Sequence, residues 1–355
     1  MNKRNKEKIK IGLIGCGRIS VQHFNSIEKI PEMELRAVCD IKTERAKKAA
    51  KKYKVDWYKD YRQLLKRDDI DLVSICTPNG LHVQMGIDTA HSGKDVVMEK
   101  PLGINLKEVD RLLNYFRKKN KKLFSVLQVR FNPPIQAVKK IIEEKKLGRI
   151  NNAALVVRWA RPQKYFDQDE WRGTKKLDGG TLLNQGIHYV DILQWLLGPV
   201  KSVFAKKDTL SHKIEIEDIV VAIFKFKNGG YATLEFTICT YPRNLECSIS
   251  ILGSKGTIKI DGLAANEIET WELENLPRPA LSSGLIPNVY AGGLYQGSCP
   301  NHLFVYKNIV RFYQGDKAAF ITDGEEARKS LEIVEAVYSS AQLKKEVFLP
   351  LKNNH

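Results

Sequence analysis

Two side chains suited to proton transfer stand beside predicted elements of regular structure. Lys100 stands two residues after the apolar run 96–98, and Pro101 restricts the backbone of Lys100, so its ammonium group would be held in one direction. His188 stands four residues after Asn184, a spacing that puts both side chains on one face of a helix. A lysine at a strand end is often a solvated cap, and an isolated histidine is often a core residue. Together, the two predict a general base, His188, and a cation, Lys100, that stabilises a developing alkoxide.

The reactant of these groups must be bound nearby, and the start of the chain predicts where. The apolar run 9–14 leads into Gly15-Cys16-Gly17-Arg18-Ile19-Ser20, the pattern of a strand, a tight turn and the start of a helix. Gly15 permits the turn and Gly17 lets the backbone approach a pyrophosphate, which the helix N-terminus attracts. The third position of the motif is Ser20, not glycine. We therefore expect a bound dinucleotide, contacted by Gly15, Gly17, Arg18 and Ile19.

A carboxylate further along the chain selects the dinucleotide. The strand predicted over 35–39 ends at Asp40, 20 residues after Ser20, where an acid accepts both ribose hydroxyls. The charge of Asp40 would repel a 2′-phosphate, so NAD is favoured over NADP. Lys42 and Arg45 are close enough in the sequence to attract a 2′-phosphate, which would weaken the preference for NAD. Positions on an exposed face of the next helix suit these two residues better.

Strands and helices alternate over the first 125 residues, which predicts a doubly wound parallel sheet. In such a sheet, ligands lie beyond the carboxyl ends of the strands. Polar residues follow three predicted strands at that edge of the sheet. One of them, His82, could contact the cofactor or could equally cap or pack its own helix. Thr77 and Asn79 offer polar groups beside the nicotinamide half. The full set of cofactor contacts expected beyond the glycine turn and Asp40 is Thr77, Asn79, His82, Glu99, Lys100 and Gln128.

The second domain is predicted to be an α+β domain with a large, open, mainly antiparallel sheet. The hydrophobic period changes to two, and glycine turns separate the strands. We place the NAD-binding domain at 1–125 and the substrate-binding and oligomerisation domain at 126–355. Residues 263–300 predict a long loop, and 302–313 and 323–343 predict helices. A broad apolar sheet face must be covered by helices or by a second subunit, so we expect a homo-oligomer, a dimer or a tetramer.

The composition argues against several classes of protein. The chain has 355 residues, a net charge of +17 and six cysteines. No apolar run reaches the roughly 18 residues of a membrane span, and the lysine-rich start is unlike a signal peptide, so we expect a cytoplasmic protein. The cysteines show no C-x-x-C pairing, from which we expect neither a disulfide nor a metal. The basic residues are spread over helix faces without a motif that reads nucleic acid, and an anionic substrate would account for part of the charge.

Taken together, these motifs resemble the Gfo/Idh/MocA oxidoreductase family, which includes glucose-fructose oxidoreductase and inositol 2-dehydrogenase. The resemblance rests on Gly15-x-Gly17, Asp40, Thr77-Pro78-x-x-x-His82 and Glu99-Lys100-Pro101, in this order and spacing. It implies an N-terminal Rossmann domain, a C-terminal open antiparallel sheet, and hydride transfer between a sugar-like alcohol and a nicotinamide.

The family has a second signature, a glycine-rich turn that leads to D-x-x-x-H. Residues 178–188 match it, except that Asn184 replaces the aspartate. An amide cannot titrate, so acid-base duty would fall on His188 and Lys100, with Asn184 limited to hydrogen bonding. The same departure leaves open a non-catalytic NAD-binding sensor, against which the presence of Lys100 and His188 argues.

Residues between the two signatures bear on the substrate, because aromatic rings and a cation suit a sugar face and an acidic substituent. The expected substrate contacts are Lys100, Arg130, Tyr165, Trp171, Arg172, Asn184 and His188. The segment resembles the subgroup of UDP-N-acetyl-2-amino-2-deoxy-D-glucuronate 3-dehydrogenases, which oxidise the 3-hydroxyl of that nucleotide sugar in bacterial surface-polysaccharide biosynthesis. Some members keep NADH bound and reoxidise it with 2-oxoglutarate. A free sugar or cyclitol is the alternative substrate, and members that cleave glycosides with a bound nicotinamide are a further variant.

Overall fold

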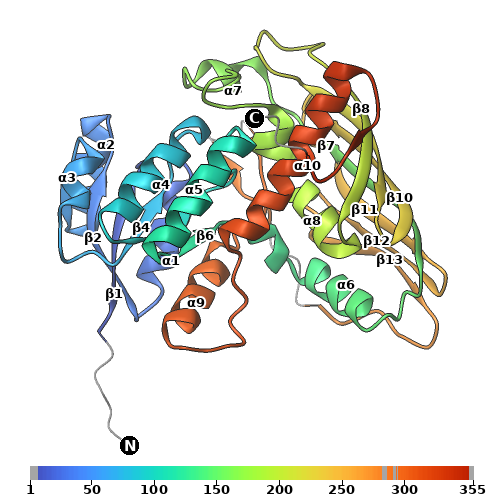
Figure 1. Cartoon of the computed structure of the whole chain (residues 1–355), viewed down its shortest axis with the longest axis horizontal. Helices are drawn as coiled ribbons and strands as arrows, with labels where there is room; N and C mark the ends of the chain where they lie inside the picture. Colours follow the sequence, from blue (N-terminus) through green and yellow to red (C-terminus); the bar gives the residue numbers. More distant parts are fainter. Residues whose placement is uncertain (1–6, 282–285, 291–292, 294, 352–355) are drawn as a thin grey trace, which may run out of the picture. The chain divides into compact units, whose positions relative to one another are not determined.

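The computed structural model describes residues 7–281, 286–290, 293 and 295–351. The chain forms two compact units (Figure 1). The first comprises Met1–Leu127 and His302–Arg328, and the second comprises Gln128–Asn301 and Lys329–His355. The chain thus returns to the first unit at 302, whereas the sequence predicted a single boundary between 125 and 126.

A parallel sheet of six strands forms the centre of the first unit, in the order β3-β2-β1-β4-β5-β6. Its strands are β1 (Ile9–Ile14), β2 (Met33–Cys39), β3 (Asp56–Tyr58), β4 (Leu72–Ile75), β5 (Asp95–Met98) and β6 (Leu123–Ser125). The helices of this unit include α1 (Ser20–Glu28), α2 (Thr43–Tyr53), α3 (Tyr61–Leu65), α4 (His82–His91), α5 (Leu106–Lys119) and α9 (His302–Tyr313). This is the doubly wound arrangement that the alternation predicted.

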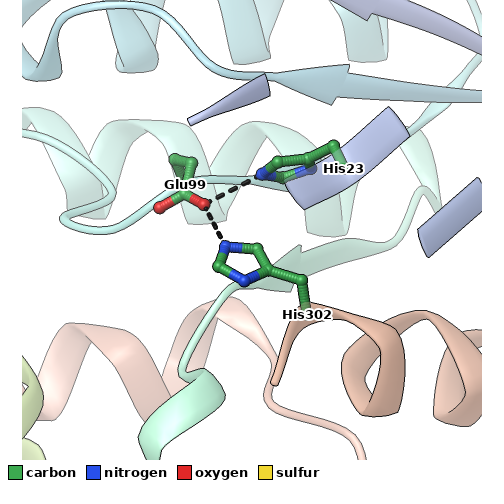
Figure 2. Close-up of side chains that lie close together, drawn as sticks. All are labelled: His23, Glu99 and His302. Carbon is green, nitrogen blue, oxygen red and sulfur yellow. Dashed lines mark hydrogen bonds and ion pairs between the residues drawn. The ribbon is translucent and has the colours of Figure 1, made fainter. Parts of the chain in front are cut away.

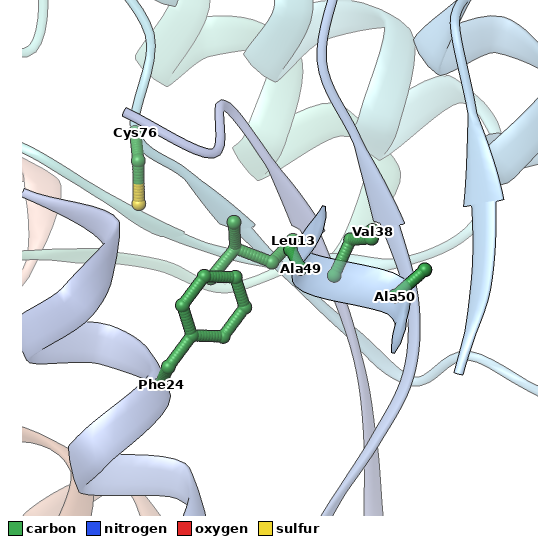
Figure 3. Close-up of a cluster of buried hydrophobic side chains, with 6 residues drawn as sticks. All are labelled: Leu13, Phe24, Val38, Ala49, Ala50 and Cys76. Atoms are coloured by element: carbon green, nitrogen blue, oxygen red, sulfur yellow. The ribbon is translucent and has the colours of Figure 1, made fainter. Parts of the chain in front are cut away.

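Apolar side chains behind the glycine turn fix the position of α1. Leu13 of β1 is paired with Val38 of β2 in parallel register, and the ring of Phe24 on α1 stacks on Tyr53 of α2 with ring centres 4.4 Å apart. The buried cluster consists of Leu13, Phe24, Val38, Ala49, Ala50 and Cys76 (Figure 3). The N-terminus of α1 is therefore anchored by packing directly below the turn.

An open sheet of eight strands forms the second unit, in the order β13-β12-β11-β7-β10-β9-β8-β16. Only β7 and β10 run parallel, and the other neighbouring pairs are antiparallel, as predicted for this domain. The strands are β7 (Ile150–Arg158), β8 (Val200–Asp208), β9 (Ile219–Phe226), β10 (Gly229–Thr237), β11 (Glu246–Gly253), β12 (Gly256–Asp261), β13 (Glu267–Leu273) and β16 (Val347–Phe348). The accompanying helices are α6 (Pro133–Glu143), α7 (Gln163–Asp167), α8 (Ile187–Leu197) and most of α10 (Gly324–Leu343).

Strand β9 shows the alternation from which the sheet was predicted. Val220, Ala222 and Phe224 are buried, whereas Val221 and Ile223 on the opposite face are about half exposed. The sheet therefore has one face in the core of the unit and one apolar face at the surface of the chain.

The prediction of a loop over 263–300 is only partly correct. β13 adds an edge strand to the large sheet, and β14 (Val289–Tyr290) pairs with β15 (Tyr295–Gln296) in a short ribbon. Residues 282–285, 291–292 and 294 of the predicted loop lie outside the described residues. Buried Ile268 between two glutamates was the alternating signal, which the surrounding glycine, proline and serine residues obscured.

Candidate active site

Two histidines hold Glu99, the residue before Lys100, in the first unit (Figure 2). Its Oε1 accepts hydrogen bonds from His23 Nε2 at 2.9 Å and from His302 Nε2 at 3.0 Å. All three side chains are buried. The other oxygen, Oε2, accepts a bond from the backbone N–H of Lys100 at 3.3 Å. Segments from α1, β5 and α9 thus meet at the residue that directs the backbone of Lys100.

The cluster is a buried anion that accepts hydrogen bonds from two imidazoles. Burial alone would raise the pKa of Glu99, but the bonds from the two imidazoles keep it well below its usual range. Burial lowers the pKa of His23, so this ring is neutral at pH 7. A neutral ring that donates from Nε2 must accept at Nδ1, which lies 2.8 Å from the Tyr306 hydroxyl and 2.9 Å from Ser74 Oγ. The ligand atoms of the three residues also lie within 4.8 Å of one another, a spacing compatible with a cation, but the hydrogen bonds account for it without one.

The turn after β1 has the geometry that a dinucleotide requires. Gly15 has a φ of +96°, and a Cβ there would lie 2.6 Å from the carbonyl oxygen of Cys76. A Cβ at Gly17 would meet nothing within 4 Å, so this side of the turn has room for a pyrophosphate. Among the described residues, no side chain caps the start of α1 at Ile19, which leaves N–H groups of the first turn as donors to an anion. These residues therefore fit NAD.

The carboxylate of Asp40 is buried at the end of β2 and bonded to the same turn. Its Oδ2 accepts from the N–H of Cys16 at 2.8 Å, and its Oδ1 accepts from the N–H of Lys42 at 2.7 Å. Each carboxylate oxygen can accept more than one hydrogen bond, so Asp40 can bind ribose hydroxyls in addition. The predicted preference for NAD keeps its physical basis, a negative charge beside the turn.

His82 lies between two loops of the first unit, and its predicted cofactor contact stays a prediction. The ring is fully buried, with Nδ1 2.7 Å from the carbonyl oxygen of Pro101 and Nε2 2.8 Å from that of Thr77. Burial lowers the pKa of His82, and a neutral imidazole donates from one nitrogen only, so the ring forms a hydrogen bond to one of these carbonyl oxygens. The ring lies between the loop after β4 and the loop that contains Lys100. Thr77 and the buried Asn79 remain predicted cofactor contacts.

In the second unit, a π-helical turn at Leu182–Gly186 precedes α8. Asn184 lies in this π-turn and His188 in the first turn of α8, and the prediction that the two side chains share one helix face stays a prediction. Asn184 Nδ2 donates to Asp178 Oδ1 at 2.7 Å, and His188 Nε2 lies 3.2 Å from Gln128 Nε2. Each of the two predicted residues thus has its own neighbour to orient it.

Asp178 is a titratable group that the sequence reasoning overlooked. It is buried, and its Oδ2 accepts from the N–H of Gly173 at 2.8 Å. Burial raises the pKa of Asp178 to about 6, against the lowering effect of its hydrogen bonds. A carboxyl group that titrates near neutral pH therefore contacts Asn184, the amide in the signature position. Its place directly before Gly179-Gly180 was the available signal.

Arg130 is buried, and its guanidinium forms a structural ion pair. Its Nε and Nη2 each lie 2.7 Å from an oxygen of Asp191, and the hydroxyl of Ser330 donates to the same carboxylate at 2.7 Å. The guanidinium also lies 5.0 Å from the ring centre of Trp195. This geometry gives Arg130 a structural role, and its predicted substrate contact stays a prediction.

The predicted substrate residues Tyr165, Trp171 and Arg172 lie together. The guanidinium of Arg172 lies 4.4 Å from the ring centre of Tyr165 and 4.5 Å from that of Trp171, and it donates to the Tyr165 hydroxyl. Asp169 lies 3.4 Å from Arg172 Nε. A pocket of about 440 Å³, whose lining includes Arg172 and Lys213, adjoins them. The cluster offers aromatic surface and positive charge in one place.

Similarity to known proteins decides the family. Residues 9–127 match the oxidoreductase family with an NAD-binding Rossmann fold, and residues 135–259 match the GFO/IDH/MocA C-terminal domain. The WlbA dehydrogenase from Bordetella pertussis, solved in complex with NADH and UDP-GlcNAcA, is 36% identical, and the match covers 98% of this chain and 100% of that one with a TM-score of 0.88. The chain belongs to the Gfo/Idh/MocA oxidoreductase family.

Two further proteins are similar to this chain, one at about the same sequence identity and one at a lower identity. The WlbA dehydrogenase from Chromobacterium violaceum is 37% identical over 98% of this chain and 97% of that one, with a TM-score of 0.88. Myo-inositol 2-dehydrogenase from Thermotoga maritima is 27% identical over 72% of this chain and 76% of that protein. The predictions of the family, the two-domain fold class and NAD as cofactor are confirmed.

Two further predictions concerned cysteines and membranes. All six cysteines lie within the described residues and are free thiols. None of the helices in the described ranges combines the length and the apolar character needed to cross a membrane.

Glu99→Gln should lower the free energy of unfolding at pH 7 by about 1.5–3 kcal/mol, because the two imidazoles lose a charged acceptor. The fold lowers the pKa of Glu99 from 4.5, so its ionisation stabilises the fold above that pH, and this contribution is lost as the pH falls below it. The difference between wild type and variant should therefore stay constant from pH 7 to about pH 5 and narrow as the pH falls further, in urea unfolding.

Glu144→Gln is the matched control, because it removes an exposed carboxylate paired with Lys146. It should change the free energy of unfolding little at either pH. A Glu99→Gln protein as stable as wild type at pH 7 would contradict the assignment of Glu99 as a stabilised anion.

Proposed function

We propose that this protein oxidises the 3-hydroxyl of UDP-2-acetamido-2-deoxy-D-glucuronic acid (UDP-GlcNAcA) to the 3-keto sugar with NAD. The observation that carries the proposal is 36% identity over 98% of the chain to a dehydrogenase solved with NADH and UDP-GlcNAcA. The inositol dehydrogenase from Thermotoga maritima reaches 27% over 72% of the chain. The oxidised position follows from the subgroup resemblance, and the net charge of +17 suits an anionic nucleotide sugar.

In the proposed mechanism, His188 is the general base and Lys100 stabilises the alkoxide. NAD, when bound, supplies the acceptor for the hydride that leaves the sugar carbon. A neutral imidazole takes the proton of the reacting hydroxyl as the C–H bond breaks. The ammonium of Lys100, whose backbone is bonded to Glu99, offsets negative charge on the same oxygen. Lys100 and His188 belong to different units, so their meeting at the substrate is part of the proposal.

Asn184 is proposed to bind the substrate without titrating. Its amide is oriented by the 2.7 Å bond from Nδ2 to Asp178, and the orientation of His188 is supported by the amide of Gln128 at 3.2 Å. Because Asp178 titrates near neutral pH, a proton lost or gained there changes the charge beside Asn184. Asp178 therefore acts in this scheme as a positioning residue.

The proposal extends to the setting of the reaction. We infer a cytoplasmic enzyme of lipopolysaccharide or related surface-polysaccharide biosynthesis, in which 2-oxoglutarate reoxidises NADH. A homo-oligomer is inferred from the outer face of the large sheet, where the exposed fractions of Phe204, Val221, Ile223 and Tyr231 range from 40% to 51%. Phe204 and Ile223 are neighbours in register on β8 and β9. A second copy of the chain would cover such a patch.

The substrate is tested by mixing purified protein with NAD and, separately, UDP-GlcNAcA, UDP-GlcNAc or myo-inositol. NADH absorbance should rise with UDP-GlcNAcA and stay at baseline with myo-inositol. Addition of 2-oxoglutarate should increase the amount of 3-keto sugar formed per subunit, measured by mass spectrometry. Turnover of myo-inositol without turnover of UDP-GlcNAcA would overturn the proposed substrate, and turnover of none would favour the NAD-binding sensor.

The catalytic roles are tested by two substitutions in the same assay. His188→Ala should lower kcat by about a hundred- to ten-thousand-fold, because the base is lost, and Lys100→Met by about a hundred- to a thousand-fold, because alkoxide stabilisation is lost. Lys107→Met removes an exposed lysine of α5 and should leave kcat unchanged. Full turnover in His188→Ala together with loss in Lys100→Met would show that Lys100 is the base.

A further inference from the structure

Arg161 is a buried cation that no described carboxylate compensates. Arg161 stands three residues after the end of β7, and it is 3% exposed. The guanidinium lies 4.7 Å from the ring centre of Trp159, 4.9 Å from that of Tyr295 and 5.7 Å from that of Tyr165. Ring faces attract a cation, but they replace only part of the hydration that a buried guanidinium has lost.

The hydrogen bonds of Arg161 are also incomplete. Nη1 donates to the carbonyl oxygen of Ala160 at 2.8 Å and to Asn244 Oδ1 at 3.3 Å. Nε is buried and has no hydrogen-bond partner among the described residues. A guanidinium has five N–H donors in a planar fork that matches a carboxylate or a phosphate. The edge that carries Nε is therefore ready to receive an anion.

Arg130, a second buried arginine of the same unit, forms the ion pair that Arg161 lacks among the described residues. Arg130 is 1% exposed, and Asp191 accepts from two of its nitrogens at 2.7 Å each. The two arginines are similarly buried, but among the described residues only Arg130 is paired with a carboxylate. A buried charge without its partner is costly, so its retention at Arg161 indicates that the partner comes from outside the chain.

A hydrogen bond from His212 fixes the backbone at Arg161. His212 Nε2 donates to the carbonyl oxygen of Arg161 at 2.6 Å, and His212 Nδ1 donates to Asp218 at 3.0 Å. Burial would lower the pKa of His212, but these bonds and the neighbouring Cys239 raise it to about 9, so both ring nitrogens donate at neutral pH. The arginine is thus positioned before a ligand arrives.

We infer that Arg161 binds an anionic group of the nucleotide sugar, either its carboxylate or its diphosphate. This inference rests on the proposed function, which supplies a ligand with both groups. Arg161 shares the ring of Tyr165 with Arg172, whose guanidinium lies 4.4 Å from that ring centre. Two cations around one ring produce a positive potential that an anionic substrate lowers. Arg161 is therefore a substrate-binding residue, in addition to Tyr165 and Arg172.

The test compares Arg161→Met with wild type by calorimetric titration of UDP-GlcNAcA, UDP-GlcNAc and UDP in the presence of NADH. If Arg161 binds the carboxylate, the dissociation constant should rise about ten- to a hundred-fold for UDP-GlcNAcA alone. If it binds the diphosphate, the constant should rise for all three ligands. The Tm of the ligand-free variant should stay level or increase, because an uncompensated buried charge is removed.

Arg130→Met is the matched control, and its Tm should fall because Asp191 is left buried without its partner. A lower Tm for Arg161→Met with unchanged dissociation constants would overturn the inference and make Arg161 a structural residue. If wild type binds none of the three nucleotides, the proposed substrate fails. Thermal shift with D-glucuronate or sulfate then decides Arg161 separately: stabilisation of wild type but not of Arg161→Met supports the anion site, and equal shifts overturn it.

Discussion

The ionised carboxylate of Glu99 links three segments that are far apart in the sequence. His23 comes from α1, which begins at the glycine turn, His302 begins α9, and Glu99 directly follows β5 (Figure 2). A buried carboxylate stays charged only while its donors remain in place, so each segment constrains the others. This constraint helps explain why 302–328 belongs to the first unit although it follows most of the second in the sequence. It also relates the turn that fits NAD to the backbone of Lys100.

Buried charged residues of this protein fall into two groups, according to how far protein hydrogen bonds and ion pairs balance their charge. The first group stabilises the fold, and the second is proposed to bind the ligand or to position residues that bind it. Glu99 and Arg130 are fully engaged by protein donors or acceptors, and both stabilise the scaffold. Asp178 and Arg161 are buried with less compensation: burial raises the pKa of Asp178 to about 6 and lowers that of Arg161. Both lie in the second unit, which is predicted to bind the substrate. Incomplete compensation is therefore the physical mark of the proposed substrate site.

Local sequence patterns predicted the helices and strands well, because hydrophobic periodicity and turn residues depend on only a few neighbouring positions. The bounds of α9 agree with the prediction over 302–313. Asp323 caps the N-terminus of α10 through a 2.9 Å bond from the N–H of Glu326. Partner choice in the core was not predictable, because the carboxylate that binds Arg130 lies 61 residues away in the sequence. Arg161 was missed although Arg161-Pro162 repeats the Lys100-Pro101 pattern of a basic residue and proline after a strand.

The protonation state of the His23 ring tests the central claim most directly. Ring ¹⁵N chemical shifts, assigned with a His23→Gln variant, distinguish neutral from cationic imidazole and identify the nitrogen that carries the proton. The account predicts a neutral ring protonated at Nε2 that does not titrate near 6.5, because burial lowers the pKa of His23 and Glu99 accepts from Nε2. A His23 signal that becomes cationic near pH 6.5, or a proton located on Nδ1, would contradict it.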